Sequence, residues 1–316
     1  MDLIGIFYKC YAHFYHRRSK RLFGKIKMNT ALTIFTLKIM NLILPLYFRI
    51  TCKNQNHRVY GRPHSADKLI VSLTSFPARI EKVWLTIESL MRQKTKPDMI
   101  ILWLSKEQFP SISSLPKRLQ KLQERGLTIS LKEGDIKSYK KYLYAMEEYP
   151  DGTIILTDDD FIYDTDLVSS LMKAHKENPN AICARYGYRM KRNSNGQISS
   201  YLSWEKIYET VPASSEVFFG SGGGTLFTKS MMYQDICNID LALKLCPTAD
   251  DIYLNAMARL NNTKICFVSG VHVLASLDID NNEKLATTNI GVECQNDIQI
   301  NKLNNYYNSK INKMVF

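Results

Sequence analysis

Apolar and polar positions alternate in blocks between residues 68 and 185. Short apolar runs predict buried strands at 68–74, 99–104, 127–131, 153–157 and 181–185. Between them, apolar residues spaced three or four positions apart predict helices at 78–93, 116–125, 138–148 and 164–178. Strands that alternate with helices indicate an α/β fold, in which a mainly parallel sheet is covered by helices on both faces.

Residues 1–62 have a different character. They include twelve Lys and Arg residues, one acidic residue (Asp2) and many large apolar side chains. The other 254 residues hold 30 cations and 29 anions, so almost all of the formal net charge of +12 lies at the N-terminus. We therefore divide the chain into a basic apolar segment, 1–62, and a nearly neutral domain, 63–316.

The apolar run between residues 32 and 48 is interrupted by Lys38, Asn41 and Pro45, whereas a membrane-spanning helix needs about 20 mostly apolar residues. Basic charge beside an apolar face is typical of a helix that lies on an anionic membrane surface. We expect residues 1–62 to form a basic amphipathic helical element on the inner face of the plasma membrane. The alternative is a helical extension that packs on the body and keeps its basic face in solvent.

Composition excludes several classes of protein. With 45% hydrophobic and 23% charged residues, the chain is not collagen-like, a coiled coil or disordered. Its seven cysteines are scattered without a C-x-x-C pair, which argues against a disulfide framework and a structural zinc site and favours a cytoplasmic protein. Because the basic charge is confined to one segment, we expect no nucleic-acid partner.

Three consecutive carboxylates, Asp158, Asp159 and Asp160, follow the expected strand 153–157. Their mutual repulsion is costly unless a cation compensates it, and ligands of parallel sheets bind beyond the carboxyl ends of strands. Extended chain would place Asp158 and Asp160 on one side, where two oxygen ligands suit Mg²⁺ or Mn²⁺. The alternative is a polar turn before the following helix.

Four motifs occur in order along the chain: TSFPARI at 74–80, TDDDFIY at 157–163, FFGSGGG at 218–224 and TADDIYLNAM at 248–257. Together they resemble the nucleotide-sugar glycosyltransferases of the GT-A type, similar to the family 2-like enzymes of bacterial surface-polysaccharide assembly. The resemblance extends from about residue 69 to residue 307. It implies a Rossmann-like GT-A fold and a UDP- or GDP-sugar donor.

The resemblance also implies roles for the acidic triplet. Asp158 and Asp160 match the element that holds Mn²⁺ or Mg²⁺ against the donor diphosphate, and Asp159 would contact ribose or donor sugar. His272 is a candidate third metal ligand, although a lone histidine also suits a polar contact in the core.

Residues after the first strand match the start of the nucleotide pocket in such enzymes. Thr74 and Ser75 would bind base or ribose, and Arg79 would bind phosphate, unless it is a surface cation on the following helix. Lys141, with Lys140 as second choice, matches a donor-binding lysine; a solvated run of charges is the rival explanation.

Asp250 and Asp251 occupy the place of the catalytic base motif. We expect Asp251 to take the acceptor proton and Asp250 to orient it or bind acceptor. Both also suit the first turn of a helix capped by Thr248. The glycines at 220–224 lack the Gly-Lys-Ser/Thr ending of a Walker loop; they match a loop beside the two sugars, or form a simple tight turn.

The expected activity is metal-dependent, inverting transfer of a sugar to a lipid-linked or oligosaccharide acceptor. Two alternatives stay open. One is a membrane- or nucleic-acid-binding protein without catalysis on the same fold, and the other is a metal-dependent nucleotidyltransferase, which also needs paired Asp residues to handle a diphosphate.

Overall fold

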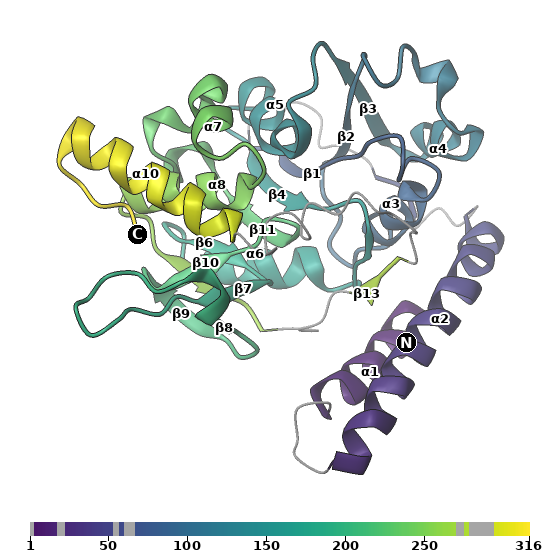
Figure 1. Cartoon of the computed structure of the whole chain (residues 1–316). Helices are drawn as coiled ribbons and strands as arrows, with labels where there is room; N and C mark the ends of the chain where they lie inside the picture. The colour runs from purple at the N-terminus through teal and green to yellow at the C-terminus, as the bar shows by residue number, and fades with distance from the viewer. Residues whose placement is uncertain (1–2, 18–22, 53–56, 60–66, 270–274, 278–293) are drawn as a thin grey trace.

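The computed structural model describes residues 3–17, 23–52, 57–59, 67–269, 275–277 and 294–316. An eight-stranded sheet with helices on both faces forms its body (Figure 1). The strand order is β3-β2-β1-β4-β11-β6-β12-β9. Its strands are β1 Leu69–Thr74, β2 Met99–Ser105, β3 Leu127–Lys132, β4 Thr153–Thr157, β6 Ile182–Ala184, β9 Val211–Ser214, β11 Gly223–Phe227 and β12 Ile265–Phe267.

The predicted α/β fold with a mostly parallel sheet is confirmed. Strands β3, β2, β1, β4, β6 and β12 run in one direction, and β11 and β9 run in the other. Strand β11 lies between β4 and β6 and was not predicted. Its sequence GGTLF begins with two glycines, which weaken the apolar signal of a strand.

Each predicted helix is present, with shifted ends. The helices of the body are α3 Val83–Met91, α4 Lys117–Lys121, α5 Lys140–Glu148, α6 Leu167–Glu177, α7 Ile239–Leu245, α8 Asp250–Leu260 and α10 Gln295–Ile311. Helix α3 begins later than residue 78 because residues 77–82 form turns. Short 3₁₀ segments are η2 Ile112–Ser114, η3 Leu122–Arg125, η4 Lys137–Tyr139, η5 Tyr201–Ser203, η6 Lys229–Met231 and η7 Gln234–Cys237.

Two smaller sheets flank the main one. Strands β10 Val217–Phe219, β7 Gly187–Arg189 and β8 Glu205–Lys206 form a three-stranded antiparallel sheet. Strands β13 Ala275–Ser276 and β5 Phe161–Ile162 form an antiparallel pair directly after the acidic triplet.

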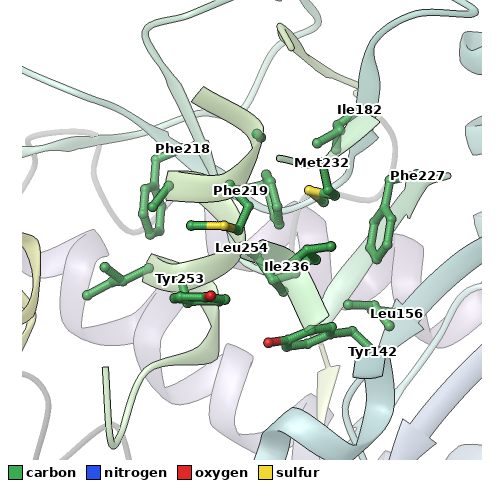
Figure 2. Close-up of a cluster of buried hydrophobic side chains, with 14 of the residues drawn as sticks. Tyr142, Leu156, Ile182, Phe218, Phe219, Phe227, Met232, Ile236, Tyr253 and Leu254 are labelled. Atoms are coloured by element: carbon green, nitrogen blue, oxygen red, sulfur yellow. The ribbon is translucent and has the colours of Figure 1, made fainter. Parts of the chain in front are cut away.

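The two faces of the main sheet are covered by separate hydrophobic cores. Along β1, Ile70 belongs to the core under α5 and α8, whereas Val71 belongs to the core under α3 and α6. In the first core, Tyr142 of α5 and Leu254 of α8 pack with residues of the sheet (Figure 2). A strand that is buried on both faces reads as the continuous apolar run seen in the sequence.

The N-terminal segment is a hairpin of two helices, α1 Leu3–Arg17 and α2 Phe23–Thr51 (Figure 1). One face packs on the body: Tyr8 and Phe48 are buried, and the Tyr8 hydroxyl contacts the carbonyl of Ile162 and accepts the N–H of Ala275 at 3.2 Å. Helix α2 continues through Pro45, which loses one backbone hydrogen bond without ending the helix.

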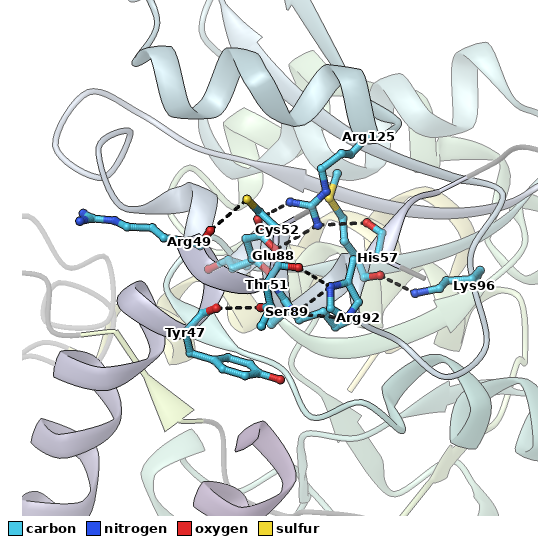
Figure 3. Close-up of polar contacts among 12 residues, drawn as sticks. Tyr47, Arg49, Thr51, Cys52, His57, Glu88, Ser89, Arg92, Lys96 and Arg125 are labelled. Atoms are coloured by element: carbon cyan, nitrogen blue, oxygen red, sulfur yellow. Dashed lines mark hydrogen bonds and ion pairs between the residues drawn. The ribbon is translucent and has the colours of Figure 1, made fainter. Parts of the chain in front are cut away.

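An ion network secures the C-terminal end of α2. The buried carboxylate of Glu88 accepts from Arg92 at 3.0 Å and from Arg125 at 3.1 Å (Figure 3). The Arg92 guanidinium lies 4.6 Å from the ring centroid of Phe48. The hairpin is therefore joined to the body by apolar packing and by buried charge.

The outer face of α2 stays apolar. Leu42 is 77% exposed, and Phe35, Leu46 and Ile50 are also exposed. Among the described residues, the stretch Met28–Thr51 has the length and composition to cross a membrane, with a mean hydropathy of 1.7, although 28% of it is buried in the protein. The helical N-terminal extension is confirmed, and it packs on the body while it exposes an apolar face.

Candidate active site

Most of the predicted site residues converge at one edge of the main sheet. Because β1 and β4 are parallel neighbours, Ser75 and the acidic triplet emerge at the same edge. Helices α5 and α8 begin there and bring Lys141 and the pair Asp250 and Asp251. The glycine loop at 220–224 leads into β11, which pairs with β4.

Asp159 is held on both of its oxygens. Ser75 Oγ donates to Oδ2 at 2.6 Å, and Arg79 donates to Oδ1 at 2.7 Å. Burial raises the pKa of Asp159, and the charge of Arg79 opposes that rise. The Arg79 side chain is only 15% exposed, so it is not a surface cation. Asp159 and Ser75 thus fix Arg79 beside the other carboxylates.

Lys141 joins the two acidic motifs. Its buried ammonium lies 2.7 Å from Asp158 Oδ1 and 3.2 Å from Asp250 Oδ2. Lys140 is also buried but contacts Asp135. The preference for Lys141 over Lys140 therefore agrees with the geometry, and neither lysine belongs to a solvated run of charges.

The simple alternation expected for the triplet is wrong. The chain bends at Asp159 and Asp160. As a result, Asp160 Oδ2 lies 3.0 Å from Arg79 Nη1, the same nitrogen that donates to Asp159. Asp158 and Asp160 are still neighbours: burial, and next the charge of Asp158, raise the pKa of Asp160 to about 7. Asp160 Oδ1 is buried and has no hydrogen-bond partner.

This donor set fits a hard divalent cation. Five aspartates face two cationic side chains, Lys141 and Arg79, which leaves an excess of negative charge, and the unpartnered Asp160 Oδ1 can accept a metal ion. Within the described ranges no group of three His, Cys, Asp or Glu side chains is arranged to hold a metal. A cation here would take few protein ligands and complete its shell with water and phosphate, as Mg²⁺ commonly does.

Asp250 and Asp251 lie at the start of α8 but are not capped by Thr248. The N-cap is Ala249, and Thr248 instead bonds to Gln299, so the capping prediction is wrong. Asp251 Oδ1 accepts the N–H of Ser221 at 2.8 Å. Burial, and then the charge of Asp250, raise the pKa of Asp251 to about 7. A carboxylate of that pKa suits a general base near neutral pH.

The glycine loop fits between the two acidic motifs. A Cβ added at Gly222 would lie 1.8 Å from Asp158 Oδ2, and one added at Gly220 would lie 3.7 Å from Asp251 Oδ2. Tyr163 supports the same arrangement, since its hydroxyl accepts the N–H of Asp158 at 2.8 Å and contacts the carbonyl of Gly222. The loop thus lies between the two acidic motifs, and the absence of side chains at Gly220 and Gly222 leaves room for their carboxylates.

Two predicted residues stand apart. Thr74 Oγ1 donates to the carbonyl of Trp103 at 2.8 Å, a contact between strands, and His272 lies outside the described residues. Sequence reasoning missed Tyr163 and Ser221, which contact Asp158 and Asp251. Their positions within the TDDDFIY and FFGSGGG motifs were the available signal.

No family model and no curated protein matches the chain. Similar solved structures include a mannosyltransferase from Pyrobaculum calidifontis in complex with GDP-Man and Mn²⁺, at 12% identity over 88% of this chain and 75% of that one, with a TM-score of 0.47. Another is a 4-diphosphocytidyl-2C-methyl-D-erythritol synthase from Anaerococcus prevotii, at 15% identity over 71% and 98% of the two chains, with a TM-score of 0.45. Likeness at this level is too distant to argue for an activity.

Proposed function

We propose that the protein is a metal-dependent, inverting glycosyltransferase of the GT-A type that acts in surface-polysaccharide synthesis. It would move a sugar from a UDP- or GDP-sugar to a hydroxyl of a lipid-linked or oligosaccharide acceptor. One observation carries the proposal: Lys141 contacts both Asp158 of the acidic triplet and Asp250 of the base motif. The residues suited to a donor diphosphate and those suited to acceptor deprotonation therefore adjoin.

The donor would be bound by charge. Asp158 and Asp160 would hold Mn²⁺ or Mg²⁺, whose chemistry is to offset the negative charge that develops on the departing diphosphate. Arg79, held by Asp159 and Ser75, would present a guanidinium to phosphate. Lys141 would hold the Asp158 carboxylate in place through their contact at 2.7 Å.

Asp251 would act as the general base. The N–H of Ser221 holds Oδ1, which leaves Oδ2 for the acceptor hydroxyl. As the acceptor oxygen bonds to the anomeric carbon, its proton passes to Asp251, and the bond from that carbon to the diphosphate oxygen breaks. The nucleoside diphosphate leaves from the opposite side of the sugar, which inverts the anomeric configuration.

Residues 1–62 would keep the enzyme on the inner face of the plasma membrane. Two features support this location: the charge of twelve cations against one anion in that segment, and the exposed apolar side chains of α2, including Phe35, Leu42 and Leu46. A helix with this combination binds anionic lipid through the attraction of its cations to the headgroups and through burial of its apolar side chains. A lipid-linked acceptor would be met at the same surface.

Nucleotide binding and product analysis test the proposal. Thermal unfolding of the wild type should shift upward with UDP or GDP only when Mn²⁺ is present, since a ligand of the native state stabilises it. Asp158→Asn and Asp160→Asn should abolish the shift, whereas Asp166→Asn, which removes an exposed carboxylate paired with Lys94, should keep it. Transfer should release a nucleoside diphosphate; release of pyrophosphate would identify a nucleotidyltransferase instead.

A further inference from the structure

A cluster of aromatic side chains adjoins Asp251. Tyr186 and Tyr188 come from the segment of β7, and Tyr201 and Trp204 come from η5 and the residue after it. The ring centroids of Tyr186 and Tyr188 are 5.7 Å apart, those of Tyr188 and Tyr201 are 5.7 Å apart, and those of Tyr201 and Trp204 are 4.8 Å apart. We call these four residues the aromatic platform.

The surroundings of Gly220 place the aromatic platform beside the proposed base. A Cβ added at Gly220 would lie 2.6 Å from Tyr186 Cδ1 and 3.7 Å from Asp251 Oδ2, so the ring and the carboxylate flank the same glycine. Burial raises the pKa of Tyr201, and the nearby Tyr188 and Asp251 raise it further.

The three tyrosines are half-buried. The hydroxyls of Tyr186 and Tyr188 bond to each other at 2.8 Å. The backbone of Tyr201 is held in place, because its N–H donates to Asp297 of α10 at 2.7 Å. The platform thus combines fixed ring surfaces with phenolic hydroxyls, and aromatic groups of this kind suit a partner with both apolar and polar faces.

The platform extends toward the N-terminal hairpin. The Lys206 ammonium lies 4.7 Å from the ring centroid of Tyr186 and 5.6 Å from that of Tyr15 on α1. Lys206 belongs to β8, so the three-stranded sheet that also carries Tyr188 reaches α1 through this side chain. Lys206 therefore links Tyr15 of the N-terminal hairpin to Tyr186, which adjoins Asp251 across Gly220.

We propose that the aromatic platform is the acceptor subsite and binds a pyranose ring of a saccharide. The apolar C–H face of the sugar would pack on Tyr186 and Tyr201, and its hydroxyls would bond to the phenols. This inference rests on the proposed function, because it takes Asp251 as the base that the bound saccharide must reach.

Saturation-transfer NMR with a panel of methyl hexopyranosides, in the absence of nucleotide, tests the site directly. At least one glycoside should receive saturation from the wild type, and Tyr186→Ala and Tyr201→Ala should each weaken its affinity by about tenfold. Tyr201→Phe, which keeps the ring, should lose less. Tyr149→Ala is the matched control, because Tyr149 is half-buried at the far end of β4 from Asp158.

The shift in unfolding temperature caused by UDP or GDP with Mn²⁺ checks that each variant is folded and retains its donor site. Saccharide binding lost only in the platform variants, with that shift intact, supports the subsite. A panel without any bound glycoside, or affinity unchanged in Tyr186→Ala and Tyr201→Ala, overturns it. If UDP or GDP with Mn²⁺ does not shift the unfolding temperature of the wild type, that result counts against the proposed function, whether or not a glycoside binds.

Discussion

The carboxylate of Asp158 fills the space that a side chain at Gly222 would need. An added Cβ would lie 1.8 Å from Asp158 Oδ2, a separation that real atoms do not tolerate. Gly222→Ala must therefore displace the carboxylate. We expect Mn²⁺-dependent affinity for UDP or GDP, measured by titration calorimetry, to fall at least about tenfold, as is typical when a group that supports a metal ligand is disturbed.

Gly196→Ala is the control for that substitution. Gly196 lies in an exposed turn where an added Cβ meets nothing within 4 Å, although its φ of +75° makes alanine strained there. The control should lose some stability and keep the affinity of the wild type. Wild-type affinity in Gly222→Ala would contradict the role given to Asp158.

Lys141 is the second residue whose removal should be severe. Its side chain is 3% exposed and its ammonium contacts Asp158 and Asp250, so Lys141→Met leaves these two carboxylates without their cation. Breaking a buried ion pair costs roughly 3–5 kcal/mol, and the partial exposure of Asp158 reduces that figure. Urea unfolding at pH 8 should show a loss of about 2–3 kcal/mol.

Lys94→Met provides the comparison, since Lys94 pairs with Asp166 in solvent and exposed pairs contribute about 0–1 kcal/mol. Equal losses in the two variants would mean that Lys141 is no more than a surface cation.

The topology explains why much of this site was predictable. Ser75 and Asp158 follow parallel neighbouring strands, and the period of the apolar runs was enough to place both at one edge of the sheet. The contact of Gly222 with Asp158 was not predictable, because it depends on β11 entering the sheet between β4 and β6. The sharing of Arg79 by Asp159 and Asp160 depends on a local bend that the strand pattern does not encode.

The two raised carboxyl pKa values predict how stability depends on pH. Asp160 and Asp251 have pKa values of about 7 in the folded protein, against 3.8 as the ordinary value. The folded state therefore holds protons more tightly than the unfolded state. The stability that these groups contribute is fully present below about pH 4 and is lost as pH rises through 7. Without metal, the midpoint temperature of thermal unfolding should decrease as the pH is raised from 5 to 8.

Asp251→Asn and Asp160→Asn should each flatten that dependence, because an amide does not titrate in this range. The unfolding temperature of each variant should be most similar to that of the wild type at low pH, where both carboxyl groups are neutral. A slope between pH 5 and 8 that is unchanged in both variants would show that other groups cause it.

The outer face of α2 should bind anionic membrane. Leu42 and Leu46 are exposed and one helical turn apart, and Leu44 between them is buried against the body. Leu42→Asn with Leu46→Asn should weaken binding to phosphatidylserine-containing vesicles by about tenfold or more, since each buried large apolar side chain contributes roughly 1.5–3 kcal/mol. Unfolding temperature in solution should change little. Leu44→Asn should instead lower the unfolding temperature, because it places an amide in the core. Vesicle sedimentation at low and high salt measures the binding, and undiminished sedimentation of the double variant would remove α2 as the membrane contact.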